Sequence, residues 1–223
     1  MSRRIRLVIF DLDGTLIDAY QAVYESINFC LHAAGSPSIS HEKIKRTVGW
    51  GDRHLLVTLL GETGIDKILR MYRQHHSQSL RRGSKLLPGA LETLQALQEQ
   101  GYLLAVASNR PTMFSRIVLR HLGIARYFKY VLCGDKVSRP KPYPDMLQQI
   151  LRRFAVRPRE ALYVGDMTID VEAGRRARVP TVAVTGGSSR RQELEMLSPL
   201  AVVRSVKNLL PLLAQLQEDK GEL

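Results

Sequence analysis

Five short apolar segments recur along the 223-residue chain, and small or polar residues follow each of them directly. Such segments, rich in β-branched residues, are typical of parallel strands that are covered on both faces. They lie at residues 5–10, 103–107, 130–133, 161–164 and 181–184. Because all five share one pattern, we expect them to form one sheet.

Amphipathic helical patterns alternate with these strands. The clearest lie at residues 90–100, 112–122, 144–154 and 169–176. The alternation predicts parallel strands joined by right-handed crossovers, which is an α/β fold with a doubly wound, mostly parallel, Rossmann-like sheet. Ligands bind such sheets at the carboxyl ends of the strands, where the polar residues of this chain lie.

The region between the first two strands breaks this alternation. Its patterns are all helical, at residues 19–34, 41–48, 52–60 and 66–81, with glycine-containing breaks between them. A segment of this length cannot pack as one crossover, so we expect an inserted α-helical cap domain. We place the cap at residues 18–85 and the α/β core domain at residues 1–17 and 86–223. An insert that follows the first strand is expected to cover the carboxyl end of that strand.

The end of the chain extends the same pattern. Residues 201–216 are expected to form a short edge strand and then a helix with one apolar face. Residues 217–223 are polar, and we expect them to form a frayed tail.

The cellular compartment is predicted from features that the sequence lacks. The first apolar run meets Asp11 and Asp13 within a few residues, which a signal peptide would not tolerate. No apolar run approaches the length of about 18 residues that a membrane-spanning helix needs. The two cysteines, Cys30 and Cys133, stand far apart without a metal-like spacing, which favours a reducing compartment. We therefore expect a cytoplasmic protein with no membrane partner.

The formal net charge of +12 could indicate nucleic-acid binding. However, the basic residues are scattered as pairs, and aromatic residues make up only 6% of the chain. We therefore do not expect nucleic acid to be the main substrate, and we interpret the charge as a field that attracts small anions.

The first chemical motif is the sequence Asp-Leu-Asp-Gly-Thr at residues 11–15, directly after the first strand. Two carboxylates two residues apart in an extended chain point the same way and repel each other, which a divalent metal ion would relieve. An aspartate can attack phosphorus, and a second carboxyl group can give a proton to the leaving oxygen. Asp11 and Asp13 must then have different environments. Thr15 is a candidate phosphate-binding residue.

Two further motifs could hold a phosphoryl group. Ser108 and Asn109 follow the second strand, where a hydroxyl and neighbouring N–H groups can bind a phosphoryl oxygen. Lys141 lies between two prolines that stiffen the backbone. A fixed ammonium there can neutralise both an aspartate nucleophile and a phosphoryl group.

Asp166 and Asp170 form the last motif, after the fourth strand. Carboxylates four residues apart share one face of a starting helix and provide the oxygen ligands that Mg²⁺ prefers. All four motifs follow strands of one predicted sheet, so we expect them to meet at one edge of it. Together they would provide a nucleophile, an acid, a phosphate clamp, a cation and a metal site.

These four motifs, in this order, resemble those of the haloacid dehalogenase-like superfamily. The similarity extends over residues 7–213 and is greatest to its phosphoglycolate phosphatase-like branch, which has a helical cap of the C1 type. The resemblance implies that Asp11 is the nucleophile and a metal ligand. It implies that Asp13 is the general acid/base and binds the metal through its backbone carbonyl. The dehalogenases of the family lack this second aspartate, so Asp13 argues for phosphate chemistry.

The same resemblance assigns the remaining motif residues. Ser108 would bind the phosphoryl group and Lys141 would stabilise its charge. Asp166 would ligate Mg²⁺, and Asp170 would support the metal directly or through water.

The cap contributes one candidate loop, residues 48–54, in which two glycines flank Trp50. Arg53 in this loop could bind a carboxylate or a second phosphate of the substrate. The histidines lack spaced partners, and we predict no zinc site.

We therefore predict a magnesium-dependent phosphatase that hydrolyses a small phosphate monoester, such as 2-phosphoglycolate, through an aspartyl-phosphate. The motifs also fit an inorganic pyrophosphatase, a sugar-phosphate or nucleotide phosphatase, and a β-phosphoglucomutase-like phosphotransferase. A non-catalytic binding protein on the same fold is a further alternative, which the intact carboxylates and Lys141 disfavour. A monomer and a homodimer are both compatible with the sequence.

Overall fold

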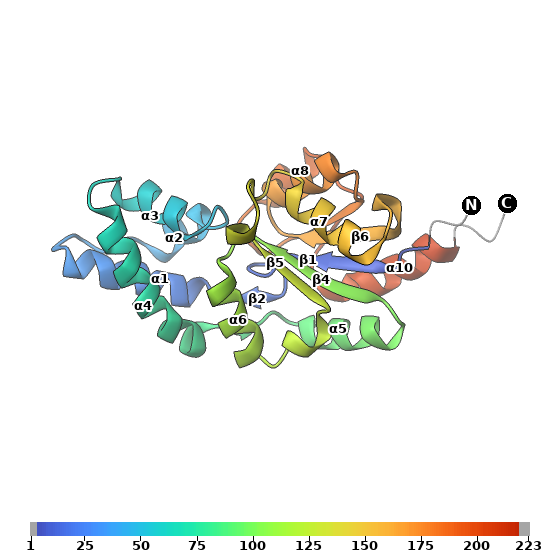
Figure 1. Ribbon diagram of the computed structural model, residues 1–223, viewed down its shortest axis with the longest axis horizontal. Helices are drawn as coiled ribbons and strands as arrows, with labels where there is room; N and C mark the ends of the chain where they lie inside the picture. Colours follow the sequence, from blue (N-terminus) through green and yellow to red (C-terminus); the bar gives the residue numbers. More distant parts are fainter. Residues whose placement is uncertain (1–3, 219–223) are drawn as a thin grey trace.

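The computed structural model describes residues 4–218, and its centre is a parallel sheet of six strands (Figure 1). The strand order is β5-β4-β1-β6-β7-β8. The strands are β1 (Leu7–Phe10), β4 (Leu103–Ser108), β5 (Tyr130–Cys133), β6 (Ala161–Gly165), β7 (Thr181–Val184) and β8 (Ala201–Val203). The five predicted strands, the predicted edge strand and the doubly wound α/β fold are therefore confirmed.

Helices cover both faces of this sheet. They are α5 (Ala90–Glu99), α6 (Thr112–His121), α7 (Asp145–Phe154), α8 (Thr168–Ala177), α9 (Arg191–Glu195) and α10 (Leu209–Glu218). Helices α5, α6 and α10 pack on one face, and α7 and α8 pack on the other. The predicted helix and edge strand at residues 201–216 are present, whereas residues 219–223 of the predicted tail lie outside the described residues.

Strand β1 shows why an uninterrupted apolar run is needed here. Val8 and Phe10 belong to the hydrophobic cluster on the α5 side, and Leu7 and Ile9 belong to the cluster on the α7 side. Successive side chains of a strand alternate between faces, so a central strand with two covered faces must be apolar at every position. All four side chains are fully buried, and each contributes about 1.5–3 kcal/mol by leaving water.

The segment between β1 and the second strand of the sheet is helical, as predicted. It contains α1 (Tyr20–Ala33), α2 (His41–Thr47), α3 (Asp52–Leu60) and α4 (Ile65–Gly83), which we call the helical insert. These helices bury a hydrophobic cluster of their own, which Phe114 of α6 joins from the core.

A small antiparallel pair joins the insert to the rest of the chain. Strand β2 (Ile17–Asp18) pairs with β3 (Lys85–Leu86), so the two connections run side by side. Each strand has only two residues, which is too short for a sequence pattern to indicate.

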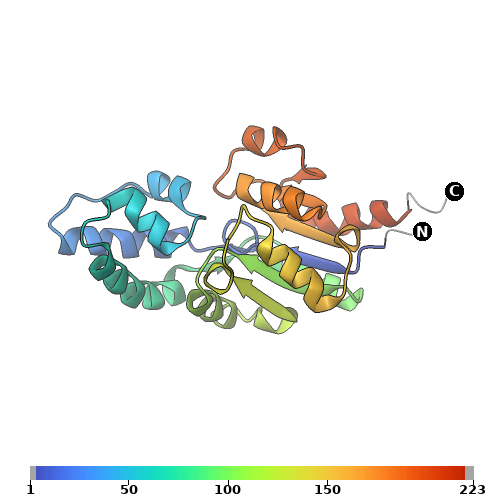
Figure 2. The ribbon, with the colours of Figure 1, turned by 45° about the horizontal axis from the view of Figure 1, so that its top comes forward.

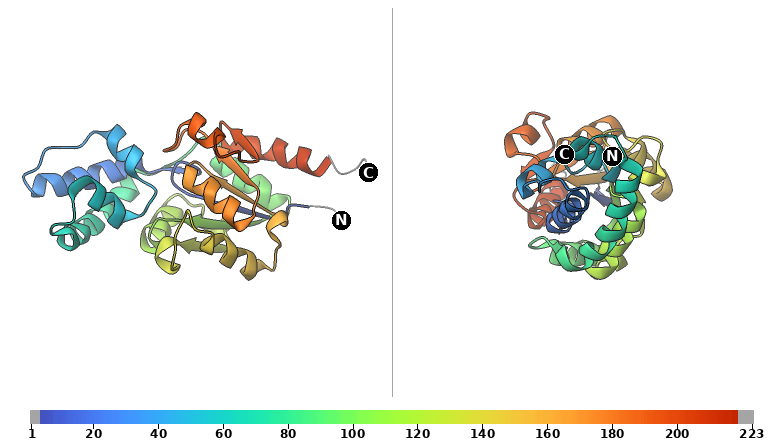
Figure 3. Two further views of the ribbon diagram at one scale, coloured as in Figure 1. Left: turned by 90° about the horizontal axis from the view of Figure 1, so that it is seen from above. Right: turned by 90° about the vertical axis from the view of Figure 1, so that its left-hand side faces the viewer.

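The insert lies beyond the carboxyl ends of the sheet strands, and α10 lies toward the opposite end of the molecule (Figures 2 and 3). The polar residues that follow β1, β4 and β6 therefore face the insert. Within residues 4–218, none of the helices has the length and apolar character needed to cross a membrane.

Candidate active site

The chain after β1 turns tightly and presents Asp11 and Asp13 in different environments. The carbonyl of Leu12 accepts hydrogen bonds from the N–H groups of residues 15–17, and Gly14 has a φ of 81°. A Cβ at Gly14 would overlap the carboxyl group of Asp166, so only glycine allows this close approach. Asp11 is 6% exposed, whereas the side chain of Asp13 is 26% exposed. The predicted roles, nucleophile for Asp11 and general acid/base for Asp13, require two carboxyl groups in different environments, and this difference in exposure is of that kind.

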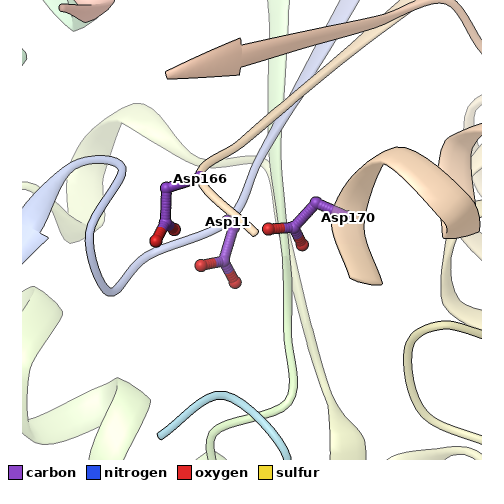
Figure 4. A group of neighbouring side chains, drawn as sticks. All are labelled: Asp11, Asp166 and Asp170. Carbon is purple, nitrogen blue, oxygen red and sulfur yellow. The ribbon is translucent and has the colours of Figure 1, made fainter. Parts of the chain in front are cut away.

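Three carboxyl groups come together at the strand ends (Figure 4). Asp11 follows β1, Asp166 follows β6, and Asp170 lies in the first turn of α8. One carboxylate oxygen from each residue lies within 4.8 Å of the other two, and all three residues are buried. We call these three side chains the carboxylate cluster.

Lys141 is the cation of this cluster. Its Nζ donates to Asp11 Oδ1 at 2.6 Å, to Asp170 Oδ1 at 2.7 Å and to the Tyr163 hydroxyl at 3.1 Å. Burial alone would lower the pKa of Lys141, but the attraction of the two carboxylates outweighs burial and raises this pKa. Lys141 therefore stays charged and holds Asp11 and Asp170 in place.

One ammonium does not balance three buried carboxylates. Burial raises the pKa of Asp11 to about 7, since it outweighs the attraction of Lys141, and the repulsion of Asp170 adds to the rise. Burial, followed by repulsion from Asp170 and Asp11, also raises the pKa of Asp166 well above its usual range. A cation bound among the three oxygens would relieve this repulsion, and an all-oxygen donor set suits a hard divalent ion. The donor chemistry of the cluster therefore fits a metal site.

Neighbouring groups fix the orientation of these carboxylates. Asp166 accepts from the Thr15 hydroxyl at 3.1 Å and from the Ser188 N–H at 2.9 Å. Asp170 accepts from the Tyr163 hydroxyl at 2.7 Å and from the Met167 N–H at 2.9 Å, which caps α8. The sequence predicted Thr15 as a phosphate-binding residue, whereas its hydroxyl here holds Asp166.

The Ser108–Asn109 motif lies beside the cluster. Ser108 is buried, and its Oγ accepts from the Arg110 N–H at 3.3 Å. Asn109 Nδ2 donates to the carbonyls of Lys141 at 3.0 Å and Gly49 at 2.9 Å, while its Oδ1 accepts from the Lys141 N–H at 2.9 Å. The Asn109 amide therefore holds the Lys141 backbone and the insert loop, a use that differs from the predicted phosphate contact.

Arg110 is the main site residue that the sequence analysis missed. It is 8% exposed and grips Asp13 with two bonds, Nε to Oδ2 at 2.8 Å and Nη2 to Oδ1 at 2.5 Å. The available signal was its place directly after Ser108 and Asn109 at the end of β4. An arginine there was indistinguishable from the many other arginines of a basic chain.

A cavity of about 70 Å³ lies between the strand ends and the insert. Its lining combines polar core residues, among them Asp11, Asp13 and Ser108, with apolar residues of the insert such as Val48 and Leu55. This volume exceeds the roughly 10–15 Å³ that one water needs, so the cavity is large enough to admit a ligand. The cavity therefore suits a small ligand.

The predicted insert loop reaches this cavity, but Arg53 does not. Gly49, Gly51 and Asp52 line it, while Arg53 is absent from the described residues of the lining. The Arg53 side chain is 53% exposed and pairs with Asp66 at 2.6 Å. Trp50 is also exposed and lies beside His54. The arrangement thus separates Arg53 from the other predicted site residues.

Two residues of α4 contribute to the cavity wall instead. Tyr72 and His76 line it, and their rings stack with centroids 4.9 Å apart. Burial, with the positive charge of Arg110 second, lowers the pKa of His76 well below its usual range. His76 is therefore a neutral wall residue.

Comparison with known proteins identifies the relatives of this chain. The model of the haloacid dehalogenase-like hydrolase family matches residues 8–184. A phosphoglycolate phosphatase of Shigella boydii is 31% identical, with 98% of each chain covered. The phosphoglycolate phosphatase of Escherichia coli strain K12 is 30% identical with the same coverage. A crystal structure of a predicted phosphoglycolate phosphatase from Haemophilus somnus superposes with a TM-score of 0.88 at 28% identity, covering 95% of this chain and 99% of the other.

The chain therefore belongs to the haloacid dehalogenase-like hydrolase family. The relatives also confirm its predicted place among the phosphoglycolate phosphatase-like members and its prediction as an enzyme of the phosphatase type.

Proposed function

We propose that the chain is a Mg²⁺-dependent phosphatase that hydrolyses a small phosphate monoester such as 2-phosphoglycolate through an aspartyl-phosphate on Asp11. The observation that carries this proposal is the position of Asp11. Its carboxyl group lies against Lys141 at 2.6 Å, belongs to the carboxylate cluster and lines the same cavity as Asp13. The relatives named phosphoglycolate phosphatase support the substrate class.

The metal assignment follows from the donor set. We assign Mg²⁺ to the carboxylate cluster together with the backbone carbonyl of Asp13. A bound Mg²⁺ supplies positive charge that keeps Asp11 ionised and stabilises the negative charge of the phosphoryl oxygens.

Asp11 and Asp13 divide the chemistry. In the first step an Asp11 oxygen bonds to phosphorus as the bond from phosphorus to the ester oxygen breaks, and Asp13 gives a proton to that oxygen. In the second step Asp13 takes a proton from water as the water oxygen bonds to phosphorus. The bond from Asp11 to phosphorus then breaks, which releases inorganic phosphate and restores the Asp11 carboxylate.

Ser108 and Lys141 position the transferred group. The Ser108 hydroxyl at the end of β4 is assigned to a phosphoryl oxygen. The Lys141 ammonium, which already contacts Asp11, neutralises the charge that develops between nucleophile and phosphorus.

We propose that the insert is a cap domain at residues 18–85 and that residues 1–17 and 86–223 form the catalytic domain. The β2–β3 pair at residues 17–18 and 85–86, and the separate hydrophobic cluster of the insert, support these boundaries. A cap above the strand ends would exclude water from the covalent intermediate.

The size of the cavity favours a small ester over a nucleotide or a sugar phosphate. A cavity of about 70 Å³ with apolar insert residues in its wall leaves more room for a ligand such as 2-phosphoglycolate than for a larger ester.

The test is a panel of phosphate esters and pyrophosphate assayed with Mg²⁺ and with excess chelator. We expect hydrolysis of short esters, weak activity on nucleotides and pyrophosphate, and loss of activity in chelator. Full activity in chelator, or preference for pyrophosphate, would contradict the proposal.

A further inference from the structure

We propose that Arg110 binds a second acidic group of the substrate, a carboxylate, and that it does so by exchanging its bonds to Asp13 for bonds to the ligand. This inference rests on the proposed function and names the residue that selects acidic esters. It also moves substrate selection from the insert arginine, Arg53, to a loop of the core.

Arg110 has an unused donor in a buried place. The residue is 8% exposed, and its Nη1 has no hydrogen-bond partner among the described residues. Buried polar groups almost always have partners, so a buried donor without one calls for an explanation, of which a missing ligand is one. Arg110 also lines the cavity.

The charges around the cavity leave this role to Arg110. Lys141 also lines it, but its ammonium is held by Asp11, Asp170 and Tyr163. His76 is kept neutral by burial, which lowers its pKa well below the usual range. Arg110 is thus the one cation of the described lining that retains a donor for a ligand.

The geometry of Arg110 matches a carboxylate. Its Nε and Nη2 already hold both oxygens of Asp13 as a planar pair. A substrate carboxylate presents the same two oxygens and can take the same pair of bonds. Because Asp11 and Arg110 line one small cavity, a short ester can place its phosphate at Asp11 and its carboxylate at Arg110.

The exchange has a second consequence for Asp13. Both of its oxygens are bound to Arg110, whereas the proposed mechanism requires Asp13 to reach the leaving oxygen of the ester. A substrate carboxylate that takes over Arg110 releases Asp13 for this contact. Esters without a second acid would leave Asp13 bound and would react slowly.

The test compares two substrates that differ only at the second group. They are 2-phosphoglycolate and 2-hydroxyethyl phosphate, in which a neutral hydroxymethyl group replaces the carboxylate. The ratio of their kcat/KM values with Mg²⁺ is measured for the wild type and for Arg110→Gln, Arg110→Lys and Arg53→Gln. We expect a ratio of about 100 for the wild type, since sites built around a polar partner reject analogues that lack it strongly.

Arg110→Gln is expected to lower this ratio at least tenfold, because kcat/KM should fall much more on 2-phosphoglycolate than on the neutral ester. Arg110→Lys keeps the charge but not the planar pair of donors, so its ratio is expected between those of the wild type and Arg110→Gln. Three results would each overturn the inference. They are a smaller fall of the ratio in Arg110→Gln, a wild-type ratio below about ten, and a fall of the ratio in Arg53→Gln instead.

Arg157→Gln is the matched control. Arg157 forms the same kind of paired bonds with Glu160, Nε to Oε2 at 2.8 Å and Nη2 to Oε1 at 3.0 Å, outside the described lining of the cavity. We expect its ratio to equal that of the wild type. Circular dichroism of each variant checks folding, and Arg110→Lys provides the test if Arg110→Gln does not fold.

Binding gives a readout that needs no turnover. In an Asp11→Asn background with Mg²⁺, calorimetry should show 2-phosphoglycolate binding at least tenfold more weakly when Arg110→Gln is added, and equal binding would overturn the inference. Failure of the proposed function would appear differently, as a folded wild type that hydrolyses no ester of the panel.

Discussion

The cavity has a core side, which we call the floor, and an insert side, which we call the roof. The two sides are held in place by different interactions. The floor consists of polar residues such as Asp11 and Asp13 after β1 and Ser108 and Arg110 at the end of β4, together with Lys141, and the parallel pairing of β1 with β4 brings these two strand ends together. The roof consists of insert residues such as Val48, Leu55 and Tyr72, which belong to the hydrophobic cluster of the insert. We infer that the floor determines the reaction and recognises the acidic group of the substrate, whereas the roof limits the size of the substrate, and five predictions test this division.

The largest effect is expected at the nucleophile. Asp11→Asn should lower kcat by at least about 10⁴-fold, because an amide cannot form the acyl phosphate that splits hydrolysis into two steps. The thermal unfolding midpoint should stay within a few degrees of the wild type. Appreciable residual phosphatase activity in the folded variant would refute the role of Asp11.

Lys141→Met should damage both chemistry and stability. It leaves Asp11 and Asp170 buried without their cation, and breaking a buried ion pair costs about 3–5 kcal/mol. We expect kcat to fall about 10³-fold and urea unfolding without metal to show a lower free energy of unfolding. Lys85→Met is the surface control, since Lys85 pairs with Asp18 at 3.5 Å while 76% exposed. A stability loss equal to that of the control would contradict the buried role of Lys141.

The carboxylate cluster should make the metal-free protein sensitive to pH. The pKa of Asp11 is raised by burial to about 7, so the folded state holds a proton that the unfolded state loses near pH 4. The contribution of Asp11 to stability therefore falls as pH rises from about 4 to about 7, by on the order of 4 kcal/mol. The raised pKa of Asp166 acts in the same direction.

Urea unfolding in chelator across this pH range measures the effect, with Asp11→Asn as the control that should show a flatter profile. Mg²⁺ should raise the unfolding midpoint more at pH 8 than at pH 5, because the ionised cluster binds the cation. Equal stabilisation at both pH values would count against the cluster as the metal site.

A roof substitution should change selectivity more than chemistry. Leu55→Ala removes buried apolar volume beside the cavity and should lower the free energy of unfolding by about 2–3 kcal/mol. We expect less than a tenfold change in kcat on 2-phosphoglycolate and a relative gain on larger esters. A loss of kcat comparable to that of a floor variant would contradict the inference that the floor, and not the roof, determines the reaction.

The smallest effect is expected at a polar contact between the insert and the core. Arg46 of α2 donates to the Ser188 carbonyl at 2.9 Å and pairs with Glu193 of α9 at 3.6 Å. Arg46→Ala should raise KM two- to fivefold and change the free energy of unfolding by less than about 1 kcal/mol, since the pair is partly exposed. An unchanged KM would show that this contact does not hold the insert closed.

Floor and roof also differ in how much of each could be predicted from the sequence. The strands of the floor were predictable because a strand buried on both faces needs an unbroken apolar run, and the chemical residues follow such runs directly. Parallel strands bring their carboxyl ends to one edge, so Asp11, Lys141, Asp166 and Asp170 could be expected to meet. The helices of the insert were predictable from their period, and so was the loop that reaches the cavity, but which of its side chains would face the cavity was not.

The sequence by itself determined the sheet, the helical insert and the carboxylates with their lysine, because these depend on local apolar patterns and on the direction of parallel strands. Only the tertiary structure paired Arg110 with Asp13, turned Arg53 toward Asp66 and assigned Thr15 and Asn109 to holding Asp166 and Lys141. The physical reason is that a side-chain contact depends on the neighbours that packing brings from distant parts of the chain. Two arginines that look alike in the sequence therefore differ in role once one is buried beside the cavity and the other is exposed.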